Sequence, residues 1–130
     1  MNKYEKLFDQ IATLTRSKAL TWKQIKRQAN ADLIFNPSSV FRQFTADLRR
    51  GDTIYTLLLV EKKLDVLDCD FHSERHIAEL LIVDQEGELV ATLTDSVIKP
   101  TDLLRLAGMV ETQSPKSVQL FEPWAFSTIV

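Results

Sequence analysis

Cysteine, glycine and long apolar runs are all scarce in this sequence of 130 residues, and each scarcity excludes a class of protein. The single cysteine, Cys69, cannot form an internal disulfide, which excludes a disulfide-stapled scaffold. The three glycines are scattered, so no phosphate-binding loop and no Gly-x-Ser-x-Gly nucleophile turn is present. The longest apolar runs, Leu57–Val60 and Leu80–Val83, are too short to cross a bilayer. Residues 1–10 alternate charged and apolar types, unlike a signal peptide, so we expect a cytoplasmic protein with no membrane span.

The composition is that of a globular domain. Apolar residues make up 45% and charged residues 26%, which separates the chain from disordered and membrane proteins. The 16 basic and 18 acidic side chains give a net charge of −2, which argues against a uniformly basic nucleic-acid binder. We expect a single domain over residues 1–113, followed by an apolar tail over residues 114–130.

Two helices are expected near the N-terminus. Over residues 2–16, apolar residues recur at helical spacing with charged residues between them, which predicts an amphipathic helix. A second, shorter helix is predicted over residues 22–29, because Thr21 can cap it and its apolar residues share one side.

Residues 40–48 fit two structures. Every second residue from Phe44 to Leu48 is apolar, as in a half-buried strand, but a helix would bring both together with Phe41. A helix-start pattern before the segment supports the helix. We favour the strand, because a Gly-Asp pair at positions 51 and 52 suits a hairpin turn that leads into a second strand-like stretch.

The second half of the chain predicts further strands and a closing helix. Strand patterns cover residues 53–60, 77–83 and 89–93, and an Asp-Gln-Glu-Gly turn joins the last two. A helix over residues 102–112 follows Pro100 and a capping Thr101, and its glycine, Gly108, is tolerable if another element packs close to it. These elements predict an α+β fold: an antiparallel meander sheet of about four strands packed against an N-terminal and a C-terminal helix, with the tail as a candidate fifth strand.

The order of these elements also forms a pattern. It comprises the N-terminal helix, Leu20-Thr21-Trp22, the aromatic strand Val40–Ala46, the strand Ile54–Leu57, the hairpin Asp84–Gly87 and the closing helix at Leu103–Leu106. This layout, over roughly residues 1–112, resembles that of small stand-alone uncharacterised bacterial domains. The resemblance implies the fold, and it carries over neither an activity nor a site residue. The acidic insertion between Glu61 and Glu74 and the apolar tail lie outside the pattern.

Residues 65–76 hold the side chains best suited to a metal, which are Asp65, Asp68, Cys69, Asp70, His72, Glu74 and His76. His72 and His76 could share a metal if the stretch were helical, but no second group with ligand spacing accompanies them. We therefore interpret residues 65–76 as an acidic solvated loop and predict no metal and no cofactor. The acidic neighbours of Cys69 disfavour a reactive thiolate. With no catalytic residues in view, we expect a protein that is not an enzyme.

Charge is distributed unevenly along the chain. Residues 1–50 carry 10 basic and 4 acidic side chains, and residues 51–130 carry 6 basic and 14 acidic ones. Such a bipolar surface suits the steering of a charged partner or self-association, but it is also compatible with two halves that neutralise one another within one fold. An alternative function is a winged-helix-like DNA-binding regulator that uses residues 21–60, with candidate contacts Lys23, Lys26, Arg27, Arg42, Arg49 and Arg50.

The tail gathers large apolar side chains. Phe121, Trp124 and Phe126 fall within its last ten residues, and exposing them together is costly. We expect the tail to pack on its own domain or on a partner subunit, and these three residues are the candidate partner contacts. The sequence thus predicts a small cytoplasmic interaction protein, such as an inhibitor or an immunity or antitoxin-like protein, with a protein partner or a homodimer and without nucleic acid or membrane.

Overall fold

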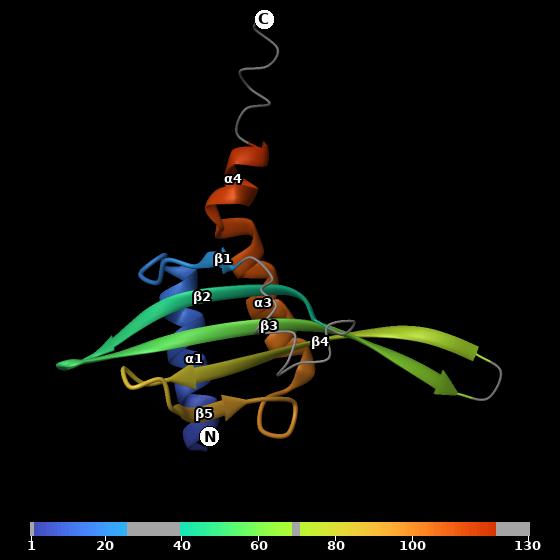
Figure 1. Ribbon diagram of the computed structural model, residues 1–130, viewed down its shortest axis with the longest axis horizontal. Helices are drawn as coiled ribbons and strands as arrows, with labels where there is room; N and C mark the ends of the chain where they lie inside the picture. Colours follow the sequence, from blue (N-terminus) through green and yellow to red (C-terminus); the bar gives the residue numbers. More distant parts are fainter. Residues whose placement is uncertain (1, 26–39, 69–70, 122–130) are drawn as a thin grey trace, which may run out of the picture.

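The sheet is an antiparallel meander whose strands lie side by side in chain order, β1-β2-β3-β4-β5, and the α+β prediction is confirmed (Figure 1). The computed structural model describes residues 2–25, 40–68 and 71–121, and for residues 64–68 and 71–74 it describes the backbone alone. The elements are α1 (Lys3–Arg16), β1 (Lys23–Ile25), β2 (Val40–Arg50), β3 (Thr53–Asp68), β4 (Phe71–Val83), β5 (Leu89–Leu93), α3 (Pro100–Gln113) and α4 (Pro115–Phe121).

Residues 40–48 form part of β2, so the strand interpretation is confirmed and the helical one is wrong. Arg50 pairs with Thr53, so the turn between β2 and β3 is the predicted Gly-Asp pair. Gly51 has a φ of +60°, a backbone conformation that glycine adopts without strain. The tight turn fixes the register of β2 on β3 and therefore places every second side chain of β2 on the same face.

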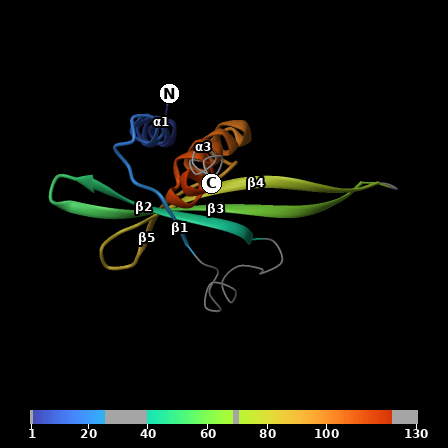
Figure 2. The same ribbon diagram turned by 90° about the horizontal axis from the view of Figure 1, so that it is seen from above.

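Both long helices lie on one face of the sheet (Figure 2). α1 begins where predicted, with the side-chain oxygen of Asn2 accepting a hydrogen bond from the backbone N–H of Glu5 at 2.9 Å. The core between helices and sheet is predominantly apolar, and its fully buried apolar members include Ile11, Phe44, Leu57, Leu59, Leu80, Leu93, Leu103, Leu106 and Val110. Burial of this one face explains the alternation of apolar residues along the strands.

The predicted helix over residues 22–29 is wrong where the structure describes it. Lys23–Ile25 forms β1, which pairs antiparallel with β2, and Lys26 to Ala29 lie outside the described residues. Trp22 is buried in the core, and its indole N–H donates to the hydroxyl of Thr15 at 3.1 Å. Pairing with the edge of β2 and the anchoring of Trp22 outweigh the weak local preference for a helix.

The acidic insertion is also different from the predicted loop. Its residues continue β3 as far as Asp68, and β4 begins at Phe71. β2 pairs with β3 only as far as Lys62 of β3, and β5 pairs with β4 only as far as Leu80 of β4. Beyond these positions, β3 and β4 pair with one another alone among the described strands. The result is a two-stranded arm that extends past the rest of the sheet (Figure 1). Acidic residues misled the sequence interpretation, because charged side chains do not prevent two strands from pairing.

The C-terminal part departs from the prediction in its details. α3 begins at Pro100, so Thr101 lies inside the helix, and the preceding Lys99 makes no side-chain capping bond. Apart from its adjacent residues and the backbone of its own helix, no described atom lies within 4 Å of a Cβ built on Gly108, so no other described element packs close to this glycine. Residues 115–121 form α4 and not a strand, and the fifth strand is β1.

Candidate functional site

A trough runs along one flank of α1, where the helix meets the sheet. Its central hollow measures about 570 Å³, and it shares Lys6, Gln10, Leu48 and Arg50 with an adjoining hollow of about 540 Å³. A third hollow of about 510 Å³, at the end near β5, shares Leu7 and Val90 with the central one. We call this continuous surface the α1 trough, and its lining residues are Lys3, Tyr4, Lys6, Leu7, Asp9, Gln10, Thr13, Leu14, Leu48, Arg49, Arg50, Tyr55, Ile82, Leu89, Val90, Ala91 and Thr92.

The sequence of α1 explains why one of its flanks remains open. Lys3, Leu7, Gln10 and Leu14 follow one another at intervals of three and four, so they form one stripe along the helix. The residues that α1 buries form a neighbouring stripe around Ile11. Leu7 and Leu14 are only partly buried, so the apolar surface of α1 is wider than its contact with the core requires.

The floor of the α1 trough comes from four strands. Leu48 pairs with Tyr55 across β2 and β3, and Ile82 pairs with Ala91 across β4 and β5. The register of β4 on β5 shifts between Ile82 and Val83, opposite Val90. Val90 lines the trough with 49% of its surface exposed, because a bulge can turn a side chain away from the regular alternation. The trough is therefore apolar at its base and at its β5 end.

Positive charge dominates the rim of the α1 trough. Lys3, Lys6, Arg49 and Arg50 line it, and Asp9 is the one acidic residue in the lining. The guanidinium of Arg50 donates a hydrogen bond to the side-chain oxygen of Gln10, a neutral acceptor. An anionic group placed here would meet cations that the described lining leaves largely uncompensated.

The opposite flank of α1 is charge-balanced. A hollow of about 300 Å³ between α1 and α3 is lined by three acidic and three basic residues, namely Glu5, Asp9, Asp102, Arg16, Lys99 and Arg105. Arg105 lies 3.4 Å from the carboxylate of Asp102. The excess of positive charge is therefore a property of the trough and not of α1 as a whole.

Arg42, a candidate DNA contact, is committed to an ion-pair cluster. Its guanidinium donates to both carboxylate oxygens of the buried Glu61, one at 2.9 Å, and lies 3.2 Å from a carboxylate oxygen of Glu111 on α3. The hydrogen bond that Arg42 donates to Glu61 raises the pKa of Arg42 above its usual value. This cluster joins β2 and β3 to α3, so the role of Arg42 in the structure is to compensate a buried carboxylate.

The helix-turn-helix on which the DNA-binding alternative depends is absent from the described residues. Both of its helices fall on strands where the structure describes them, since Lys23 lies on β1 and the second helix is β2. Lys26 and Arg27 lie outside the described residues. Arg49 and Arg50 are brought together with Lys3 and Lys6 in the α1 trough.

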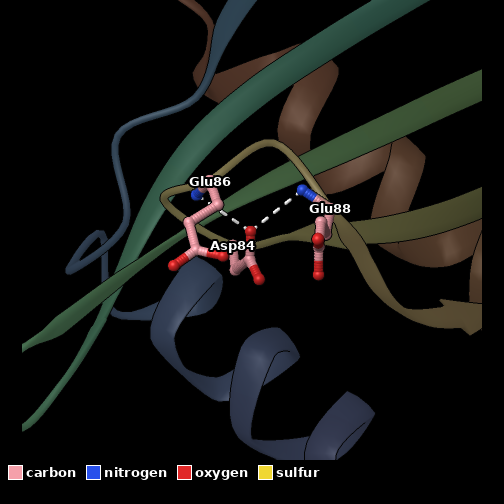
Figure 3. A group of neighbouring side chains, drawn as sticks. All are labelled: Asp84, Glu86 and Glu88. Carbon is pink, nitrogen blue, oxygen red and sulfur yellow. Dashed lines mark hydrogen bonds between the residues drawn. The ribbon is translucent and has the colours of Figure 1, made fainter.

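Carboxylates gather at the turn between β4 and β5. Asp84, Glu86 and Glu88 place their carboxylate oxygens within 4.8 Å of one another (Figure 3). One oxygen of Asp84 accepts the backbone N–H groups of Glu86 and Glu88, each at 2.9 Å. Gly87 has a φ of +84°, which completes the turn. These bonds account for Asp84 as a turn former, and the two glutamates are exposed.

The two histidines considered as metal ligands, His72 and His76, are not one helical turn apart. His72 and His76 belong to β4, so their spacing of four positions corresponds to about 13 Å along a strand and not to one helical turn. His76 is exposed, and its ring centroid lies 5.4 Å from that of Phe41.

The tail contributes one described candidate contact. Phe121 ends α4 with 65% of its surface exposed, and α4 buries none of its residues. Trp124 and Phe126 lie outside the described residues. The expectation that the tail packs on its own domain or on a partner stays a prediction.

Sequence reasoning missed Lys3, Lys6, Leu7 and Val90. The pattern of α1 could have indicated Lys3, Lys6 and Leu7. These three residues lie on the flank beside the stripe of Ile11, and they combine exposed lysines with an apolar side chain. The sequence pattern does not predict that Val90 lines this surface, because the orientation of its side chain depends on the register of β4 and β5.

Comparisons with protein-family models, with curated proteins and with solved structures found no match for this chain. Among the described residues, no helix has both the length and the apolar character that crossing a membrane requires. The geometry and the charge of the α1 trough are therefore the features that bear on function.

Proposed function

We propose that this chain is a protein-binding protein and not an enzyme, and that it acts by holding a segment of a partner in the α1 trough. The observation that carries the proposal is the combination of an apolar floor with a cationic rim in one continuous surface. Concave apolar surfaces with a few directed polar groups are where proteins bind their partners and ligands. An inhibitor, an immunity protein or an antitoxin-like protein of the cytoplasm would use such a surface.

Exposed apolar residues support this proposal. Leu89 and Val90 expose 56% and 49% of their surfaces at one end of the trough. Apolar side chains gathered at the rim of a concave surface favour contact with another protein. Phe121 on α4 is a second exposed apolar residue and belongs to a separate surface.

The test is affinity capture from a lysate of the source organism with the wild-type protein and two variants. Val90→Lys places a charge at the mouth of the trough, and Leu104→Lys makes the same change at a 39%-exposed residue of α3. We expect a specific protein to be retained by the wild type and by Leu104→Lys and to be lost with Val90→Lys. Equal retention by both variants, or no specific partner at all, would contradict the proposal.

A further inference from the structure

We infer that the α1 trough binds an amphipathic helix whose polar flank is acidic. This inference rests on the proposed function and specifies the chemistry of the partner. It depends on three observations: the direction of the trough, the interrupted edge of the sheet, and the sign of the charge at the rim.

The direction of the trough selects a helix over an extended segment. The trough follows α1 from Lys3 to Leu14, and its floor crosses β5, β4, β3 and β2 in turn. An extended segment lying across the strands would find no backbone partners in the sheet, whereas a helix satisfies its own backbone groups. The distance along α1 corresponds to about 17 Å, or roughly three helical turns of a partner.

The edge of the sheet is poorly suited to the alternative of strand addition. β5 has five residues, and the register shift opposite Val90 interrupts its pairing with β4. Short and bulged edge strands are a common means by which proteins prevent another strand from pairing. Val90 instead faces the trough, where it can contact the apolar side of a helix.

The charge of the rim selects an acidic partner. Lys3, Lys6 and Arg50 line the central hollow, and none of its described lining residues is acidic. Arg50 donates to the neutral amide of Gln10, and a carboxylate in its place would bring an opposite charge and two acceptor oxygens that match the guanidinium. Lys3 and Lys6 lie in the first turns of α1, where the helix dipole adds to their positive potential.

The acidic turn between β4 and β5 sets the orientation of the partner. Glu88 directly precedes Leu89, so the carboxylates of this turn lie near the β5 end of the trough. The acidic flank of the partner is therefore expected to face α1 and Arg50, away from this turn, because like charges repel.

The experiment measures binding of two labelled 14-residue peptides by fluorescence anisotropy. Both carry leucines at helical spacing, and the remaining positions are glutamate in one peptide and lysine in the other. At low salt, we expect the glutamate peptide to bind at least tenfold more tightly than the lysine peptide. Binding should weaken as salt is added, and the circular dichroism of the glutamate peptide should show an increase in helix on binding.

Matched charge reversals locate the effect. Lys3→Glu with Lys6→Glu changes the trough, and Lys99→Glu with Arg105→Glu makes the same change in charge near the N-terminus of α3, in the hollow on the other flank of α1. The first pair should reverse the preference towards the lysine peptide, and the second pair should leave it in place. Equal effects of the two pairs would overturn the inference.

The remaining outcomes separate the inference from the proposed function. If both peptides bind alike and Val90→Lys abolishes both, the trough is a binding surface and the acidic partner is wrong. If neither peptide binds, the inference fails, and lysate capture still tests the function. If binding survives Val90→Lys, both fail.

Duplex DNA binding that is lost with Lys3→Glu and Lys6→Glu, without peptide binding, assigns the trough to nucleic acid. Concentration-dependent dimerisation lost with Val90→Lys assigns it to a second copy of the chain.

Discussion

Removing the hydroxyl group of Thr15 should destabilise the fold, because the buried indole N–H of Trp22 would lose its acceptor. Thr15 is completely buried, and Trp22 is 2% exposed. The indole N–H of Trp22 donates to Thr15 Oγ1 at 3.1 Å, and that hydroxyl donates in turn to the backbone carbonyl of Ile11 at 2.8 Å. Valine has nearly the shape of threonine, so Thr15→Val removes the polar chain with little change in packing.

The expected magnitude follows from the indole group that is left behind. A tryptophan N–H can only donate, so without Thr15 Oγ1 it becomes a buried donor with no acceptor. Such a loss costs about 1–3 kcal/mol in the free energy of unfolding. For a domain of this size, 1 kcal/mol corresponds to roughly 4 °C, so the melting temperature should fall by roughly 4–12 °C.

The assay is urea and thermal unfolding followed by circular dichroism, which does not depend on tryptophan emission. Thr13→Val is the matched control, because Thr13 is exposed on the same helix, and its change in stability should stay within about 0.5 kcal/mol. Trp22→Phe removes the donor, so Thr15→Val in that background should cost much less than in the wild type. A Thr15→Val protein as stable as the wild type, or an equal cost in both backgrounds, would refute the reasoning.

Two further predictions concern the ion-pair cluster and the glycines. Arg42→Met leaves the carboxylate of Glu61 buried without its partner and should cost about 3 kcal/mol in urea unfolding, whereas Arg42→Met combined with Glu61→Leu should recover most of that loss. A single variant no less stable than the double would contradict this account. Gly108→Ala, in a helix with open space around the added methyl, should raise stability by about 0.5–1 kcal/mol, and Gly87→Ala, at a φ of +84°, should lower it by a similar amount or more. Melting temperatures that shift in the same direction for both glycines would show that backbone conformation does not control these sites.

The sequence predicted elements whose signals are local. The helix at residues 3–16, the Gly-Asp turn and the strand after it depend on spacing, capping and turn chemistry, all of which act within a few residues. β1 was missed because three residues carry too little periodicity to compete with the helical pattern around Trp22, and its pairing with β2 comes from a distant part of the chain.

The candidate site was harder to predict than the fold. Arg49 and Arg50 were identified as cations, but their assignment to DNA assumed a helix where β2 lies. The α1 trough joins residues from α1 and four strands, and their proximity depends on how the helix crosses the sheet. Periodicity alone does not distinguish a fully buried face of a helix from a flank that stays partly open, so it did not show that Leu7 and Leu14 are only partly buried.

The chain-order arrangement of the sheet also bears on how quickly the protein can fold. From β2 to β5, each strand pairs with the strand that follows it in the sequence, and the described turns after β2 and β4 are short. Such pairings close small loops, so each strand can add to its predecessor at a low entropic cost. The contacts between α1 and α3 join segments more than 80 residues apart and have to wait for the sheet that both helices cover. The hairpins are thus expected to form early, and the two-helix layer to close last.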